Sequence, residues 1–131
     1  MIVLDANRNI LLLQRADTGG WGLPGGFMEL GETLEETARR EVMEEVGLEL
    51  GELTLMGVFS GADQYFQYPN GDEVFNVTTV YTATARHSRM RLDPDEATTA
   101  RFVPVEEIPV DLIAPEVPIL EQYSRLVKDS Q

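Results

Sequence analysis

The sequence predicts an α/β fold in which strands outnumber helices and one helix covers each face of the sheet. Short apolar runs and stretches rich in Val, Thr, Tyr and Phe recur along the chain, as is typical of strands. Two other stretches, residues 33–47 and the chain around Pro118, repeat apolar residues at the spacing of an amphipathic helix. We therefore expect two helices packed on opposite faces of one sheet.

Length, cysteine content and charge restrict the class of protein. The chain has 131 residues, so we expect a single domain over residues 1–131. The absence of cysteine excludes disulfides, a thiol nucleophile and thiolate metal ligands. A net charge of −13 argues against non-specific binding to duplex nucleic acid, which needs basic residues to contact the phosphates. We see neither a membrane-spanning run nor a secretory signal. We expect a cytoplasmic monomer or homodimer that binds neither nucleic acid nor a membrane.

The strands are expected in segments separated by turn residues. The first two form a hairpin of buried strands, Met1–Asp5 and Ile10–Arg15, joined by Ala-Asn-Arg-Asn. The later strands are expected at Leu53–Ser60, at Glu73–Arg86 as one long strand, and at Ala100–Val105 with Phe102 buried.

Both helices have sequence signals for their starts. Thr33 and Glu36 make a capping box, and Gly47 is placed to end that helix in the left-handed conformation. Pro118 suits the first turn of the second helix. The expected buried stripes are Leu34, Ala38, Val42 and Val46 in the first helix, and Ile119, Leu120, Tyr123, Leu126 and Val127 in the second.

Three carboxylates converge on the polar side of the first helix. Glu41, Glu44 and Glu45 are spaced i, i+3 and i+4, so they lie close together and repel one another. A hard divalent cation such as Mg²⁺ or Mn²⁺ would neutralise them. The alternative is a solvated acidic face in an acidic protein.

A longer pattern surrounds these glutamates and favours the metal-binding interpretation over the solvated acidic face. It has the form G-x5-E-x7-R-E-U-x-E-E-x-G-U, where U is aliphatic, and its fixed positions are Gly26, Glu32, Arg40, Glu41, Val42, Glu44, Glu45, Gly47 and Leu48. This pattern resembles the box of the Nudix hydrolases, the MutT-like family. The resemblance implies an α/β/α sandwich with a mixed sheet. It also implies a Mg²⁺-dependent hydrolase, with Mn²⁺ possible, that cuts a pyrophosphate bond in a nucleoside diphosphate linked to another group. Relatives usually begin several residues earlier, with a longer first strand, so we expect the first strand to be either trimmed or atypical.

The resemblance also implies roles for individual residues. The metal ligands would be the carbonyl of Gly25 and the carboxylates of Glu41, Glu44, Glu45 and Glu96, the last from an acidic loop in which Asp95 is the alternative. The general base would be Glu44 or Glu45, with Glu96 as the alternative. Glu32 and Arg40 would form an ion pair that ties the loop to the helix. Gly26 and Gly47 complete the structural part of the box.

The expected substrate is a nucleotide, with contacts proposed at two residues. By its spacing to the box, Arg15 matches an arginine that contacts substrate phosphate in MutT-like proteins; the alternative is a surface arginine. Tyr65 falls where diadenosine polyphosphate enzymes have a tyrosine, within an aromatic stretch that forms either a hairpin tip or a flap for a base. Trp21 is expected in the core or in a pocket wall. We favour a nucleoside triphosphate, or a modified form of one. The alternatives are ADP-ribose, a dinucleoside polyphosphate, or a non-catalytic nucleotide sensor.

Overall fold

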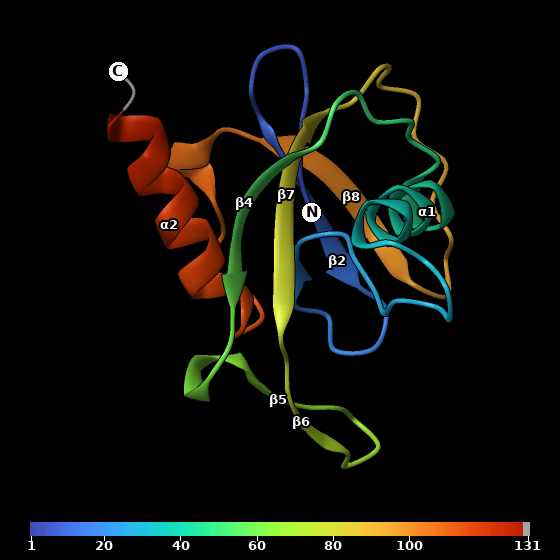
Figure 1. Cartoon of the computed structure of the whole chain (residues 1–131), viewed down its shortest axis with the longest axis vertical. Coiled ribbons are helices and arrows are strands. Elements are labelled where there is room, and N and C mark those ends of the chain that lie inside the picture. Colours follow the sequence, from blue (N-terminus) through green and yellow to red (C-terminus); the bar gives the residue numbers. More distant parts are fainter. Residues whose placement is uncertain (130–131) are drawn as a thin grey trace.

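A computed structural model describes residues 1–129 of the chain (Figure 1). Two α-helices, α1 (Leu34–Val46) and α2 (Glu116–Asp129), are formed within this range. The strands are β1 (Ile2–Leu4), β2 (Ile10–Arg15), β3 (Trp21–Gly22), β4 (Thr54–Phe59), β5 (Tyr65–Gln67), β6 (Glu73–Phe75), β7 (Thr78–Thr84) and β8 (Ala97–Val103). Short 3₁₀ turns cover Ala62–Gln64 and Val105–Glu107.

The main sheet is mixed, as the resemblance to the Nudix hydrolases implied. Its six strands run in the order β3-β2-β1-β7-β4, and β8 pairs with β2. β1 and β7 are parallel, whereas the other pairs are antiparallel. The predicted N-terminal hairpin is present, with Leu4 opposite Ile10.

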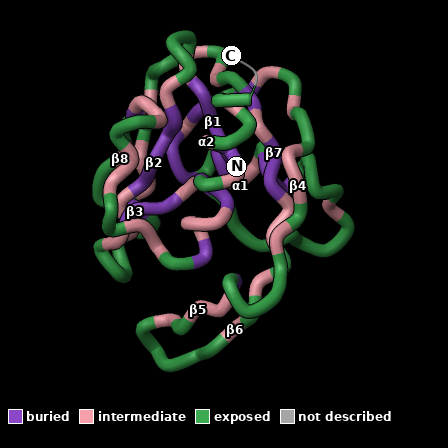
Figure 2. The backbone as a smooth tube through the Cα atoms, turned by 90° about the vertical axis from the view of Figure 1, so that its left-hand side faces the viewer, coloured by how far each residue is buried: buried purple, intermediate pink, exposed green. Residues whose placement is uncertain are grey.

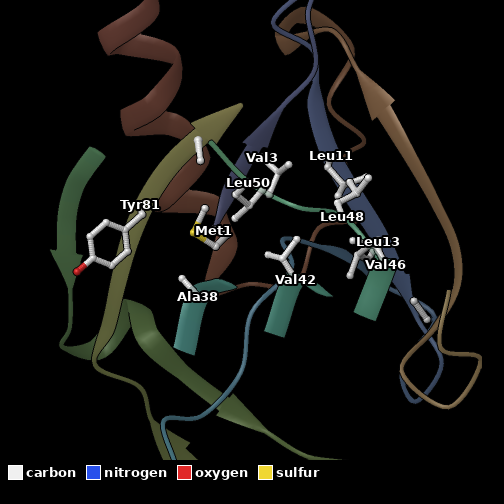
Figure 3. Close-up of a cluster of buried hydrophobic side chains, with 12 residues drawn as sticks. Met1, Val3, Leu11, Leu13, Ala38, Val42, Val46, Leu48, Leu50 and Tyr81 are labelled. Atoms are coloured by element: carbon white, nitrogen blue, oxygen red, sulfur yellow. The ribbon is translucent and has the colours of Figure 1, made fainter. Parts of the chain in front are cut away.

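The two helices lie on opposite sides of the sheet (Figure 1). Alternate residues of a strand point to opposite faces, so β1 and β2 contribute to two separate cores. Val3, Leu11 and Leu13 pack with Val42 and Val46 of α1 (Figure 3). Ile2, Leu4, Ile10 and Leu12 pack with Ile119, Leu120 and Tyr123 of α2. The result is the predicted α/β/α sandwich.

The ends of α1 follow the sequence prediction. Glu36 N–H donates to Thr33 Oγ1 at 3.1 Å, and Thr33 N–H donates to Glu36 Oε1 at 3.0 Å, which completes the capping box. Gly47 ends the helix with a φ of 71°. The prediction that Leu34 is buried is wrong, because its side chain is 45% exposed and the helix meets the core only from Thr37 and Ala38 onward.

The predicted long strand Glu73–Arg86 is wrong in its extent. The chain leaves one sheet and enters another at Asn76–Val77, so β6 pairs with β5 while β7 pairs with β1 and β4. The N–H of Asn76 donates at 2.9 Å to the carbonyl of Gln64 instead of continuing a strand ladder. The β5–β6 hairpin extends away from the main sheet (Figure 2).

The last strand and the last helix differ in detail from their predictions. β8 begins at Ala97 rather than Ala100, because its pairing with β2 continues to Arg15 opposite Ala97. Phe102 is only partly buried against the core. Pro118 lies in the first turn of α2 as expected, but Leu126 is 47% exposed and is not part of the buried stripe. Within residues 1–129, no helix is both long and apolar enough to cross a membrane.

Candidate active site

The three box carboxylates of α1 have different environments. Glu45 is buried, at 7% exposure, beside the apolar stripe, whereas the side chain of Glu44 is 56% exposed. The side chain of Glu41 is 16% exposed, a value between those of the other two. The N–H of Gly25 donates a 2.8 Å hydrogen bond to Glu45 Oε1. This bond fixes the loop after β3 against the helix and orients the Glu45 carboxylate.

Arg40 organises the rest of the box. Its guanidinium donates to Glu32 at 2.6 Å, to Glu41 at 2.8 Å and to Glu44 at 3.1 Å. It also donates at 3.0 Å to the carbonyl of Phe27 in the loop. The predicted contact between Glu32 and Arg40 is therefore present, and the same arginine also contacts two of the clustered carboxylates, so its single positive charge is shared among these three glutamates.

Glu96 reaches the site from a loop that is tied at both ends. The N–H of Asp93 donates at 3.1 Å to the carbonyl of Glu45 at the end of α1. The N–H of Ala16, just after β2, donates at 3.1 Å to the carbonyl of Glu96. The N–H of Glu96 in turn donates at 3.0 Å to the carbonyl of Asp93. These bonds bring Glu96 to the end of α1 although the two are far apart in the sequence.

A cavity of about 120 Å³ lies where these segments meet. Its wall includes four of the predicted site residues, namely Arg15, Gly25, Glu45 and Glu96. Asp17 and Asp95 also line it. A β-bulge after Gln14 shifts the register of β2 against β8 at Arg15, and bulges of this kind change the direction of a side chain. We call this cavity the acidic pocket.

The carboxylates of the acidic pocket influence one another. Burial raises the pKa of Glu45 to about 8, with further increases from the charges of Glu41 and Glu96, and the Gly25 N–H opposes the change. Burial also raises the pKa of Glu41, and the negative charges of Glu44 and Glu96 raise it further. The carboxylates of Glu41, Glu45 and Glu96 are therefore close enough to repel one another. A cation placed among them would relieve that repulsion.

The donor set fits a hard divalent cation, although it is not arranged as a finished metal site. Among residues 1–129, no group of three His, Cys, Asp or Glu side chains has a geometry that could hold a metal ion. Arg40 occupies Glu41 and Glu44, and the Gly25 N–H occupies one oxygen of Glu45. The oxygen ligands themselves are those that Mg²⁺ and Mn²⁺ prefer.

The second predicted substrate contact, Tyr65, lies outside the acidic pocket. Its hydroxyl donates to Glu73 at 2.5 Å within the hairpin. Tyr65 and its neighbour Phe66 line a separate groove of about 360 Å³, together with Ile113. Trp21 is buried in the core against α2, with the guanidinium of Arg101 over its ring at 4.9 Å.

Sequence reasoning missed Asp17 and Ile113. Asp17 accepts two hydrogen bonds from Arg15, at 2.8 and 2.7 Å, and it stands only two residues away in the loop. That spacing is the one local signal that could have found it. Ile113 had no such signal, since it meets the hairpin only through the fold.

The fold and the pocket define a class of protein: an α/β/α sandwich that gathers carboxylates and an arginine at the end of its box helix. A family model described as NUDIX domain matches residues 1–126. The chain belongs to the NUDIX domain family, as its box predicted.

Three similar proteins illustrate this membership. The MutT NUDIX hydrolase from Burkholderia pseudomallei has a crystal structure with a TM-score of 0.74 at 31% identity, covering 92% of this chain and 94% of that one. An ADP-ribose pyrophosphatase of Methanocaldococcus jannaschii is 42% identical over 65 residues, or 47% of this chain. A putative 8-oxo-dGTP diphosphatase of Bacillus subtilis is 42% identical over 59 residues, or 45% of this chain. The matches span only 38% and 40% of the length of these two curated relatives.

Proposed function

We propose that the protein is a Mg²⁺-dependent pyrophosphohydrolase that acts on a nucleotide at the acidic pocket. One observation carries this proposal: the fold brings Glu45, Glu96 and Arg15 into one small cavity from three separate segments. Carboxylates for a cation and an arginine for phosphate are the complementary groups that a pyrophosphate requires. Membership of the NUDIX domain family supports the same chemistry.

The residues of the proposed site divide into two roles, although Glu41 and Glu44 are not among the residues that line the acidic pocket. Glu41, Glu44 and Glu96, with the carbonyl of Gly25, are the proposed ligands of the cation when Glu45 is the general base. When Glu96 is the base instead, Glu45 takes its place as a ligand. When bound, the cation would lower the pKa of a water ligand and offset phosphate charge. For Glu41 and Glu44 to act as ligands, they must exchange their hydrogen bonds to Arg40 for the cation. Arg15 lines the same pocket and would hold a phosphate group.

The general base is proposed to be Glu45 rather than Glu44. Glu45 lines the acidic pocket and is held by the Gly25 N–H, so its free oxygen has a fixed position. Glu44 points away from the core, with a 56% exposed side chain paired to Arg40. Glu96 lines the same pocket and is the alternative acceptor for the proton of an attacking water.

The proposed substrate is a nucleoside triphosphate, or a modified form, cut to a monophosphate and pyrophosphate. The relative named as a putative 8-oxo-dGTP diphosphatase supports this choice. The relative named as an ADP-ribose pyrophosphatase supports the second candidate, ADP-ribose, at the same 42% identity. A dinucleoside polyphosphate is a weaker alternative, because Tyr65, the residue that suggested it, bonds Glu73 outside the acidic pocket.

The experiment is a comparison of kcat/KM over one panel of substrates. The panel contains dNTPs, 8-oxo-dGTP, ADP-ribose, a sugar nucleotide and diadenosine tetraphosphate, each measured with Mg²⁺ and again with EDTA. We expect metal-dependent turnover with the highest kcat/KM on a triphosphate. A preference for ADP-ribose by about tenfold or more, equivalent to about 1.4 kcal/mol, would replace our first choice. Metal-dependent turnover on no member would instead favour the nucleotide sensor.

A further inference from the structure

A second cavity adjoins the acidic pocket and has the opposite character. It is an open groove of about 360 Å³ between the β5–β6 hairpin and the body of the protein. Tyr65 and Phe66 line it from the hairpin, and Ile113 and Ala114 line it from the segment before α2. Thr18 and Gly20 close it toward β2. We call it the aromatic groove. Its size lies within the range that binds small organic ligands.

Arg15 joins the two cavities. Its side chain lines the acidic pocket, and its guanidinium lies over the Phe66 ring at 5.4 Å from the ring centre. Asp17 accepts two hydrogen bonds from the same guanidinium. The guanidinium of Arg15 thus stands between the acidic pocket and the aromatic groove. A ligand with phosphates at one end and a flat ring at the other would contact Arg15 at the point where the two parts are joined.

A buried glutamine holds the base of the hairpin in place. Gln64 is 1% exposed, and its Nε2 donates at 2.9 Å to the carbonyl of Pro115, next to the groove-lining Ala114. Its Oε1 accepts a 3.3 Å hydrogen bond from the hydroxyl of Thr78 at the start of β7. These bonds fix the distance between the hairpin and the segment before α2, so the groove is a built feature of the fold.

The two aromatic side chains that line the groove, Tyr65 and Phe66, make different contacts. The Tyr65 hydroxyl is bound to Glu73, and its ring meets Phe75 edge-on at 5.5 Å. Phe66 meets Tyr68 edge-on at 5.0 Å and the guanidinium of Arg15 on its face. Phe66 is therefore the ring placed between Arg15 and the groove, whereas Tyr65 stabilises the hairpin.

We propose that the aromatic groove binds the nucleobase of the substrate, with Phe66 and Ile113 as the side chains that contact the base. This inference rests on the proposed function, because it places the phosphates of the same ligand in the acidic pocket. The apolar walls suit a flat ring, and stacking on an aromatic side chain is favourable for every base. Tyr65 also lines the groove, and its contacts with Glu73 and Phe75 hold the hairpin in place.

Binding of a nucleoside monophosphate tests the groove without requiring turnover. Guanosine 5′-monophosphate would be titrated into protein labelled at the isoleucine methyl groups, with inorganic pyrophosphate as the ligand that lacks a ring. We expect guanosine monophosphate to shift the Ile113 methyl signal with saturation, and pyrophosphate to leave it in place. A shift by both ligands, or by neither, would overturn the proposal.

Two phenylalanines of the hairpin provide matched variants. Phe66→Ala should weaken guanosine monophosphate binding by about tenfold, and Phe66→Trp should retain it, because base stacking needs a ring at this position. Phe75→Ala removes a ring of the same hairpin that lies outside the groove but packs against Tyr65, so it measures the effect of hairpin packing alone, and its loss of affinity should be clearly smaller than that of Phe66→Ala. Equal losses in Phe66→Ala and Phe75→Ala would contradict a direct contact and assign the effect to hairpin packing.

The outcomes separate this inference from the proposed function. Turnover of nucleotides by the wild type with no Ile113 shift would leave the hydrolase standing and reject the groove as the base site. A saturable Ile113 shift in a protein that turns over no nucleotide would support the groove as the base site and reject the hydrolase. A dimer in sedimentation that Phe66→Ala dissociates would show that a second copy of the chain occupies the groove, which also contradicts the proposal.

Discussion

Gly26 lies directly against the carboxylate of Glu41, so closely that a Cβ atom on Gly26 would overlap that carboxylate. The glycine therefore allows the loop after β3 to pass over the box helix. Arg40 bonds the same carboxylate at 2.8 Å and the loop carbonyl of Phe27 at 3.0 Å. The position of Glu41 thus depends on a residue that carries no functional group.

Gly26→Ala should impair activity with little loss of stability. The overlapping atoms are the far end of a flexible side chain, so Glu41 can move aside without disturbing the core. A displacement on the scale of an ångström at a site of this kind costs about 10²-fold in rate, which is the loss in kcat/KM that we expect. Gly57→Ala in β4 is the control, because its Cβ would meet Gln122 Nε2 at an ordinary 3.5 Å. Wild-type kcat/KM in Gly26→Ala would contradict this reading of the loop.

The Glu32–Arg40 pair should contribute stability that is lost in acid. The hydrogen bond from Arg40 lowers the pKa of Glu32 from 4.5 to about 2 in the folded protein. Because the folded pKa is the lower one, the contribution is fully present above pH 4.5 and disappears as the pH falls through about 2. The difference in Tm between the wild type and Glu32→Gln should therefore be largest at neutral pH and shrink below pH 4.5. Glu52→Gln, an exposed change elsewhere, should show no such trend.

A Tm difference between the wild type and Glu32→Gln that stays constant from pH 7 down to pH 2.5 would show that the ion pair is not its cause.

Mg²⁺ should stabilise the folded protein, because it would relieve the repulsion among Glu41, Glu45 and Glu96. A ligand at 100 times its Kd adds about 2.7 kcal/mol to the free energy of unfolding. Thermal unfolding would be followed during a Mg²⁺ titration, with KCl at matched ionic strength as the control. Glu41→Gln and Glu96→Gln should each reduce the shift in Tm. The same rise in Tm with KCl alone would indicate screening of the net charge and not a site.

The sequence was most informative where the controlling contacts are local. The capping box of α1 depends on Thr33 and Glu36, three residues apart, and both of its hydrogen bonds are present. The Glu32–Arg40 pair also lies within one short motif. The prediction that Leu34 is buried was wrong because apolar periodicity identifies the apolar side of a helix but does not show where the sheet that it packs on ends.

Long-range pairing limited the rest. Residues 73–86 have continuous β propensity, yet the strand breaks at Asn76–Val77 because β6 and β7 join different sheets. No local signal reports such a change of partner. The aromatic groove could not be predicted from the sequence for the same reason, since Phe66 and Ile113 line one cavity only in the folded protein. The assignments of the metal ligands and of the base remain proposals.

Replacement of Glu45 by Gln tests the central claim most directly. The change keeps the size of a buried side chain but removes the carboxylate that lines the acidic pocket. With Mg²⁺ and the best substrate of the panel, we expect kcat to fall by about 10²–10⁴-fold, the usual contribution of a general base. Far-UV circular dichroism should remain that of the wild type, and Glu49→Gln, an exposed change just past the helix, should retain full activity. Turnover by Glu45→Gln at the wild-type rate would contradict the assignment of the acidic pocket as the active site.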